Sequence, residues 1–454
     1  MQFHVKANRY AVGCVAQSNR RARRERMNYN KARQVSALGE RVVSGADESD
    51  RDARARIIRA TVTVMADRGL AGLSYRQVAS RAKVSLALVN YYYPSKFGLV
   101  AAASSAILER YTDAFARAAS RFRSGAPPSF RDFAYRLVGN ATDRDRTLTL
   151  AWAEIALDAV RHEESLSLAQ AWNVSISKLW SDIAEATGEP NPHRIARSGI
   201  DLVMGLLFFV TALRLDQEQV DQVLNHEGQP TDLWPPSTCS APSKPPAATN
   251  KAQRTRNLIL GAAIDLLISE GAAEVSFRTV AEKAGLTATA PAYHFRTTDA
   301  LLASAGMLLV ENSKQRYRGV MQSLDRQAVT FENLVEVTTT IFIREATEFS
   351  ALNLAFFSTW IEASRRPELR QTIWGFVRGI YRGWQTVFEL AAKRSLPPVT
   401  GILGFALFVG KLVRILSTGS KTMDLASIRR EFTEDFHKLC FESFWDPDAN
   451  RTRS

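Results

Sequence analysis

The chain is poor in residues that form covalent or metal cross-links. Its 454 residues include three cysteines and six histidines. Cys14, Cys239 and Cys440 are far apart and odd in number, which excludes a disulfide framework and a paired-cysteine metal site. The histidines show no ligand-like spacing. We therefore expect no metal and no cofactor, and a reducing compartment.

Signatures of catalysis and of membrane crossing are also lacking. The sequence contains no glycine-rich phosphate loop and no nucleophile elbow, so an enzyme is the least favoured class. The longest apolar stretches, 202–213 and 399–410, are about 12 residues each, short of the ~20 needed to cross a bilayer, and Arg214 or Lys411 follows at once. We expect no membrane span and interpret both stretches as buried interface helices.

Strand patterns are scarce, because no clean run alternates apolar and polar residues. Helical periodicity dominates, so the sequence predicts an all-α protein. Basic residues outnumber acidic ones, 59 against 46, which gives a net charge of +13. This balance favours a polyanionic partner, either nucleic acid or an anionic membrane surface.

Two polar segments interrupt the helical pattern. Residues 1–50 are basic and aperiodic, and we expect a mostly disordered arm in which Met27 is an alternative start. Residues 229–253 contain six prolines with serine and threonine between them, which is typical of a semi-extended linker. The linker separates two long helical segments, so an internal repeat is expected.

The two helical segments are copies of each other. A shift of 202 residues aligns 69–99 with 271–301 without a gap and gives nine identities, where ~2 are expected by chance. The identical pairs are Gly69/Gly271, Ala71/Ala273, Ser74/Ser276, Arg76/Arg278, Val78/Val280, Ala79/Ala281, Ala82/Ala284, Tyr91/Tyr293 and Leu99/Leu301. The chain is therefore interpreted as a tandem duplication.

The duplicated segment has the spacing of capped helices. In copy 1, Gly69 ends a first helix, and Ser74, three residues before Gln77, begins a second. A third helix opens at Ser85 after a short turn at 82–84. Two short helices joined by a tight turn and braced by a longer one predict a helix-turn-helix, whose third helix enters the major groove of DNA.

The candidate DNA-contacting residues of this head fall into two sets. One set lies along the third helix and is predicted to face base edges: Ser85, Leu86, Leu88 and Asn90. The other set lies near helix N-termini, where charge and helix dipole suit a phosphate. Arg76 lies near the N-terminus of the second helix, and Lys96 lies at the start of a long fourth helix after Pro94-Ser95.

Copy 1 resembles the TetR family of bacterial repressors in three consecutive motifs, SYRQVA at 74–79, AKVS at 82–85 and NYYYPSK at 90–96. Copy 2 repeats them as SFRTVA at 276–281, AGLT at 284–287 and YHF at 293–295. The resemblance covers about 45 residues per head. It implies that Arg76, Tyr91, Tyr92 and Lys96 hold the DNA backbone, and that 85–90 face the bases. It also implies a cytoplasmic, nucleoid-associated bacterial regulator.

The predicted DNA-binding residues follow from the motifs and the resemblance together. In copy 1 they are Ser74, Arg76, Lys83, Ser85, Leu86, Leu88, Asn90, Tyr91, Tyr92 and Lys96. In copy 2 they are Ser276, Arg278, Thr287, Ala288, Tyr293 and His294.

The two heads depart from each other in charge and in turn residues. Copy 1 has Lys83 where copy 2 has Gly285, and a positive φ there suits glycine. Copy 2 lacks the lysine equivalent to Lys96 and carries Pro291 inside its third helix, where proline is awkward. Residues 51–100 contain nine basic and two acidic residues, net +7, whereas 251–302 contain six and five, net +1. We expect head 1 to supply most of the affinity for DNA, with head 2 binding weakly or having lost binding.

The domains predicted from these patterns form two tandem units. Each unit is a three-helix head, at 51–98 and 254–300, followed by a helical body, at 99–228 and 301–446, with the arm, the linker and a tail at 447–454 outside them. In the TetR family the body binds a small effector and dimerises through its last two long helices in a four-helix bundle. Two bodies on one chain can pair with each other, so we expect an intrachain pseudo-dimer or, failing that, a homodimer.

The middle helices of copy 2 are rich in aromatic residues, so an apolar effector pocket is possible there, although ordinary core packing explains most of them equally well. Trp152-Ala153-Glu154 and Trp360-Ile361-Glu362 are matched positions of the two bodies. The favoured function is a sequence-specific, ligand-responsive transcriptional regulator, acting on double-stranded DNA and an unknown small molecule. The alternatives are a scaffold protein with a decayed second head and a membrane-surface sensor.

Overall fold

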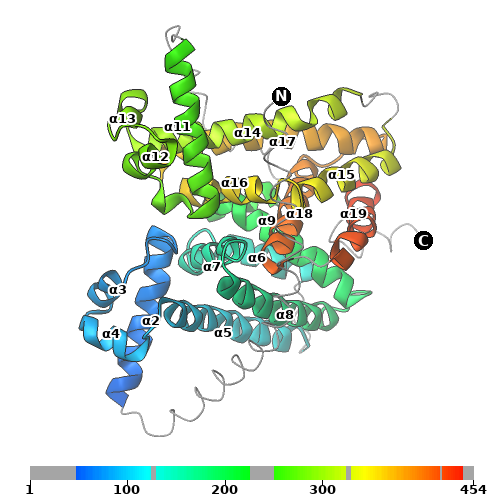
Figure 1. Cartoon of the computed structure of the whole chain (residues 1–454). Coiled ribbons are helices and arrows are strands. Elements are labelled where there is room, and N and C mark those ends of the chain that lie inside the picture. Colours follow the sequence, from blue (N-terminus) through cyan, green and yellow to red (C-terminus); the bar gives the residue numbers. More distant parts are fainter. Residues whose placement is uncertain (1–47, 124–128, 225–249, 324–328, 420–421, 443–454) are drawn as a thin grey trace. The chain divides into compact units, whose positions relative to one another are not determined.

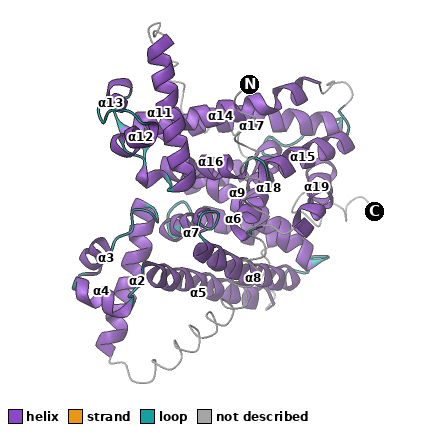
Figure 2. Ribbon diagram, in the orientation of Figure 1, coloured by secondary structure: helices purple, strands orange, loops and turns teal. Residues whose placement is uncertain are grey.

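The computed structural model describes residues 48–123, 129–224, 250–323, 329–419 and 422–442 (Figure 1). Every regular element within these ranges is a helix (Figure 2), as the periodicity predicts. The predicted arm, linker and tail lie outside the described residues, except that 48–50 and 250–253 already belong to helices. The first helix of the described residues is α2 (Glu48–Arg68), which opens head 1.

Head 1 continues with the short helices α3 (Tyr75–Ala82) and α4 (Leu86–Tyr92). Both have the predicted serine caps. The Ser74 hydroxyl accepts a hydrogen bond from the Gln77 amide at 3.4 Å, and the Ser85 hydroxyl accepts one from the Leu88 amide at 3.1 Å. The Tyr75 hydroxyl donates to the carbonyl of Tyr93 at 2.7 Å, which fixes α3 against the end of α4.

Head 2 consists of α11 (Asn250–Ser269), the 3₁₀ turn η2 (Ala272–Glu274), α12 (Phe277–Ala284) and α13 (Ala290–His294). Ser276 and Thr279 form a reciprocal capping box at the start of α12. The third helix begins at Ala290 and not, as the alignment with Ser85 suggests, at Thr287. Proline lacks an amide hydrogen and is tolerated only in the first turn of a helix, and the later start places Pro291 there.

Each head is followed by six helices in the described residues. In copy 1 they are α5 (Lys96–Arg123), α6 (Phe130–Asn140), α7 (Arg146–Asp158), α8 (Glu163–Ala186), α9 (Pro192–Leu213) and α10 (Gln217–Leu224). In copy 2 they are α14 (Thr298–Ser323), α15 (Phe331–Ala346), α16 (Ser350–Ala363), α17 (Pro367–Ala392), α18 (Thr400–Thr418) and α19 (Thr422–Phe441). Because α5 and α14 each run from a head into a body, one continuous helix joins the two.

The helices α8, α9, α17 and α18 pack together as a four-helix bundle, with α9 directly against α18. Their closest approach is reciprocal. A Cβ atom placed on Gly205 would lie 1.9 Å from the carbonyl oxygen of Ala406, and one on Gly410 would lie 1.7 Å from that of Asp201. A shift of 205 residues carries Asp201 to Ala406 and Gly205 to Gly410, so copy 1 and copy 2 use equivalent positions to meet.

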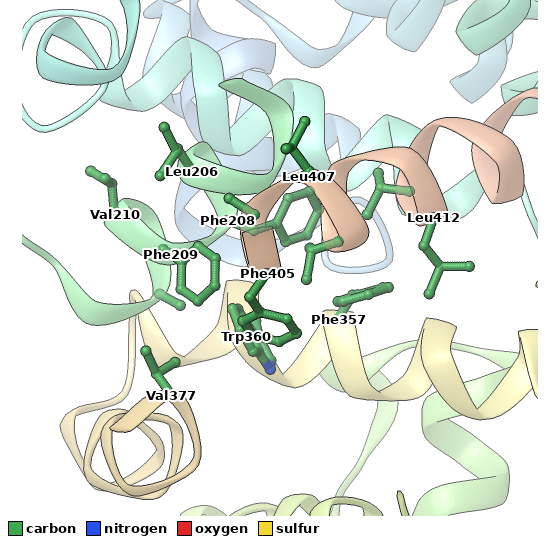
Figure 3. Close-up of a cluster of buried hydrophobic side chains, with 14 of the residues drawn as sticks. Leu206, Phe208, Phe209, Val210, Phe357, Trp360, Val377, Phe405, Leu407 and Leu412 are labelled. Atoms are coloured by element: carbon green, nitrogen blue, oxygen red, sulfur yellow. The ribbon is translucent and has the colours of Figure 1, made fainter. Parts of the chain in front are cut away.

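Both central helices are apolar and mostly buried. Of the described residues, α9 and α18 are the helices long and apolar enough to cross a membrane, and 83% and 78% of their apolar windows are buried inside the protein. Phe209 of α9 packs edge-on against Trp360 of α16 and Phe405 of α18, each at a centroid distance of 5.2 Å (Figure 3). This aromatic contact joins side chains of the two copies in one core.

A network of charged side chains crosses the same interface. The Lys411 ammonium is completely buried and lies 2.8 Å from the Asp201 carboxylate, also completely buried, and 2.7 Å from Glu431 of α19. Arg414 adds an ion pair to Asp201 at 2.6 Å. Burial alone would raise the pKa of Asp201, but the charges of Arg414 and Lys411 outweigh it and lower this pKa below its ordinary value. Asp201 is therefore ionised at neutral pH.

Two arginines, one in each body, bind the head of the other copy. Arg365, just beyond α16, donates to the carbonyls of Ala66 at 2.8 Å and Met65 at 3.2 Å, at the end of α2. Arg161, just beyond α7, donates to the carbonyls of Ile268 at 2.9 Å and Leu267 at 2.8 Å, at the end of α11. We call Arg161 and Arg365 the crossed arginines. Each satisfies carbonyls that a helix C-terminus leaves without intrahelical partners.

Glu154 of α7 binds both sides of the contact at head 1. One of its carboxylate oxygens accepts from the Leu70 amide at 3.1 Å, and the other accepts from Arg365 at 2.8 Å. Glu362, the matched position of copy 2, binds both Arg365 and Arg366. The two matched glutamates therefore hold the arginine that spans from copy 2 to head 1.

Candidate nucleic-acid interface

The outward face of α4 is formed by residues at helical spacing. Ser85, Leu86, Ala87, Asn90 and Tyr91 are exposed, and Tyr91 retains 76% of its surface. Leu88 was predicted on this face but is half-buried. The side-chain amide of Asn90 donates to the Leu86 carbonyl at 3.1 Å, so part of its hydrogen-bonding capacity is used within the helix.

The residues predicted to hold phosphates surround this face. Ser74 and Arg76 are exposed at the start of α3, and Lys96 is exposed at the start of α5, where its ammonium donates to the Ala71 carbonyl at 3.5 Å. The ring of Tyr91 packs edge-on against that of Tyr92, with centroids 5.2 Å apart. The half-buried Tyr92 thus supports the exposed Tyr91.

The turn between α3 and α4 requires a left-handed backbone. Lys83 has φ 55° and ψ 48°, and its equivalent, Gly285, has φ 66° and ψ 32°. The sequence predicted that this position favours glycine, and the positive φ of both residues confirms it. Lys83 therefore holds a strained conformation while exposing its side chain.

Replacing Lys83 with glycine should stabilise head 1 by roughly 0.5–1 kcal/mol, because glycine adopts a positive φ without a steric penalty. The free energy of unfolding, measured by urea denaturation, tests this expectation. Gly285→Lys is the matched control and should destabilise head 2. Equal stability of Lys83→Gly and the wild type would contradict the assignment of strain.

Head 2 presents an equivalent but less basic face. Arg278, Thr287, Ala288 and Tyr293 are exposed, with Tyr293 at 86%, whereas Ser276 and His294 are half-buried. Thr287 and Ala288 lie in the turn before α13 and not on the helix itself, which corrects the alignment-based placement.

The face of head 2 is supported from within by buried residues. Pro291 is buried at the position of Val89, and the neighbouring Phe295 is covered by the guanidinium of Arg256 at 4.1 Å from its ring centroid. Burial lowers the pKa of Arg256. Its guanidinium also donates to the His294 carbonyl at 3.1 Å, so it binds the C-terminal end of α13.

The electrostatic difference between the heads follows from the sequence. Asp299 of α14 stands where copy 1 has Phe97, next to the threonine that replaces Lys96, and it forms an ion pair with Arg366. Its charge is therefore partly compensated within copy 2. The net charges of the two segments still differ, at +7 for 51–100 and +1 for 251–302.

Three of the residues described above, Ala87 and the two crossed arginines, were not predicted from the sequence. Ala87 is exposed on α4, and the helical period with Val89 buried would have placed 86, 87, 90 and 91 outward. The crossed arginines had no local signal, because each contacts carbonyls more than a hundred residues away in the chain.

The fold and this surface define a helix-turn-helix DNA-binding domain that is present twice. Residues 57–103 and 259–305 match the family described as bacterial regulatory proteins, tetR family, and 125–226 match a tetracyclin repressor-like C-terminal domain. Two segments of the chain therefore match the TetR family's DNA-binding domain, and the chain is a DNA-binding transcription regulator with a tandem repeat of that head.

No curated protein matches the chain. Among solved structures, a crystal structure of the multidrug binding protein EbrR complexed with imidazole is 24% identical to this chain. The match covers 39% of this chain and 93% of that one, with a TM-score of 0.32.

Proposed function

We propose that the chain is a ligand-responsive repressor that works as an intrachain pseudo-dimer. In this proposal copy 1 and copy 2 pair through α9 and α18 and set two unlike heads on one DNA duplex. The operator is then asymmetric, and its two half-sites lie one or more helical turns apart. The chain acts in the bacterial cytoplasm, at the nucleoid.

The repeated outward face carries the proposal of DNA reading. Tyr91 and Tyr293 occupy equivalent positions and are exposed to 76% and 86%, although large aromatic side chains are usually buried. Tyrosines exposed at the C-terminal end of the third helix of each head supply both a hydroxyl donor for phosphate and an apolar ring. Ser85, Leu86 and Asn90 are the proposed base contacts of head 1.

The one-sided charge network supports pairing between unlike copies. The shift of 205 residues places Ala406 where copy 1 has Asp201, and Leu206 where copy 2 has Lys411. If α9 paired with α9 of a second chain, each completely buried Asp201 would lack its basic partners. A buried carboxylate without a partner is strongly unfavourable, so the network disfavours pairing of like copies.

The proposed domains keep the predicted order of head and body in each copy, joined by α5 and α14. Head 1 supplies most of the affinity through Arg76, Lys83, Tyr92 and Lys96, and head 2 contributes weaker contacts through Arg278. An effector bound in a body would favour a head separation that does not match B-form DNA.

Replacing Arg76 and Lys96 together with alanine should weaken DNA binding uniformly across sequences. The slope of log K against log salt should fall by about two units, because about one counter-ion fewer is released for each lost phosphate contact. Gel shifts over a salt series measure both quantities. Arg278→Ala should lower the slope by at most about one unit.

Lys178→Ala is the matched control, since it removes one exposed cation of α8 outside the heads. An unchanged slope in the Arg76/Lys96 variant would contradict the assigned DNA face. A protein that enriches no DNA sequence, or that instead binds anionic vesicles, would favour the scaffold or membrane-sensor alternative.

A further inference from the structure

The two bodies differ most in their internal space. The body of copy 2 contains a cavity of about 720 Å³, with walls from α14, α15, α16, α17 and α18. The corresponding region of copy 1 contains a cavity of about 110 Å³, because side chains such as Phe115, Trp172 and Trp180 pack into it. A volume of about 720 Å³ accommodates a drug-sized molecule, whereas 110 Å³ does not.

The wall of the larger cavity is apolar and aromatic. Six rings line it: Phe356, Phe357, Phe376, Trp384, Phe405 and Phe408. The acid in its wall, Glu345, is buried and already held by Arg316 at 3.2 Å and by the Asn353 amide at 2.7 Å. The interior therefore offers an apolar surface and a compensated ion pair, but no charge that requires a ligand.

The rim of the cavity, in contrast, is polar and basic. The exposed lining residues mark where it opens: Lys314, Asn333, Gly379, Arg382, Gly383 and Thr386. Two of these are cations and none is an acid. A Cβ atom on Gly379 or Gly383 would have no neighbour within 4 Å, so α17 adds no side chain to the opening at these two positions.

One helix of the cavity wall, α16, leads directly to a contact with head 1. Phe356 and Phe357 of α16 line the cavity, and α16 ends at Ala363. Two residues later Arg365 binds the end of α2 in head 1. A bound molecule that displaces α16 of copy 2 would therefore also displace the contact between Arg365 and head 1 of copy 1.

We propose that the copy 2 cavity binds one large apolar anion per chain, and that its occupancy is relayed to head 1 through α16 and Arg365. The apolar part of the ligand lies among the aromatic rings, and its anionic group lies at the rim beside Lys314 and Arg382. The ligand is an apolar carboxylate or sulfonate, either aromatic or aliphatic. The relay rests on the proposed repressor function, whereas ligand binding does not.

Fluorescence titration of the full-length chain tests the ligand class without DNA. The probes are the anion anilinonaphthalene sulfonate, its neutral analogue N-phenylnaphthylamine, and the cation rhodamine 6G, with dodecanoate as an aliphatic competitor. We expect one saturable site for the anion, displaced by dodecanoate if aliphatic acids are the natural class. Lys314→Gln with Arg382→Gln should weaken anion binding about three- to tenfold and barely change the neutral probe, because exposed charges contribute modestly.

Two filling variants locate the site. Val337→Trp, in the copy 2 wall, should abolish binding of the anion and of the neutral probe. Ile176→Trp, in the small copy 1 cavity, is the matched control and should leave both unchanged. Thermal melting of each variant checks that it is folded. Equal binding of anion and cation, or binding that survives Val337→Trp in a folded protein, would overturn the proposal.

DNA affinity measured with and without the anion tests the relay. Saturating anion should change affinity in the wild type, and Arg365→Gln should bind the anion normally but lose most of that change. Arg161→Gln is the control, since it removes the crossed arginine of head 2. A full response in Arg365→Gln would overturn the relay. Anion binding by a chain that never binds DNA would instead count against the proposed function alone.

Discussion

Replacing Lys411 with methionine should lower the free energy of unfolding by about 3–5 kcal/mol, because it removes one partner from a buried network of ion pairs and leaves Asp201 with Arg414 alone. Lys411 and Asp201 are both completely buried, and they lie on helices of different copies. The loss should therefore appear as a weakened association between the copies. Urea denaturation, followed by far-ultraviolet circular dichroism, measures it.

The double variant Asp201→Leu/Lys411→Met is the control for charge balance. Removing both ions should cost much less than removing one, because no unpaired charge remains buried. The pKa of Asp201 is lowered in the folded protein, so its contribution is fully present above its unfolded pKa, about 4, and is lost as the pH falls further. The difference between the wild type and Lys411→Met should therefore shrink in acid. A pH-independent difference, or a double variant as unstable as the single one, would contradict this role of the network.

Replacing Gly410 with valine should separate α9 from α18 and destabilise the chain by about 3 kcal/mol or more. The added side chain would meet the backbone of Asp201 and Gly205, which cannot rotate away as a side chain could. We expect the freed apolar faces to associate between chains. Sedimentation should then show masses above the 50.5 kDa of one chain, which is the mass expected for the wild type.

Gly375→Ala is the matched control for this substitution. It also changes a helical glycine of copy 2, but a Cβ atom there has no neighbour within 4 Å. Alanine should stabilise α17 by about 0.5–1 kcal/mol. A Gly410→Val chain that remains a stable monomer would show that the α9–α18 contact is not what pairs the copies.

Local signals in the sequence were sufficient to predict the heads. Caps are short-range features, so Ser74 and Ser85 predict the starts of α3 and α4. The left-handed turn at Lys83 was also predictable, because glycine stands at the same position of the other copy. The alignment failed at Thr287, where the restriction imposed by Pro291 outweighed the copied cap.

The features that join the copies could not be predicted in the same way. Asp201 and Lys411 are 210 residues apart, and nothing in either neighbourhood indicates that they meet. The same holds for the crossed arginines, which bind backbone carbonyls that any sequence supplies. The aromatic content of copy 2 was visible in the sequence, but only packing decides whether such rings fill a core or line a cavity.

Selection of duplexes from a random DNA pool by the full-length chain, followed by native mass measurement of the complex, tests the central proposal most directly. We expect an asymmetric site with one strongly and one weakly specified half, bound by a single 50.5 kDa chain. A palindromic site bound by two chains would contradict the intrachain pseudo-dimer, and a pool without any enriched sequence would contradict sequence-specific binding itself.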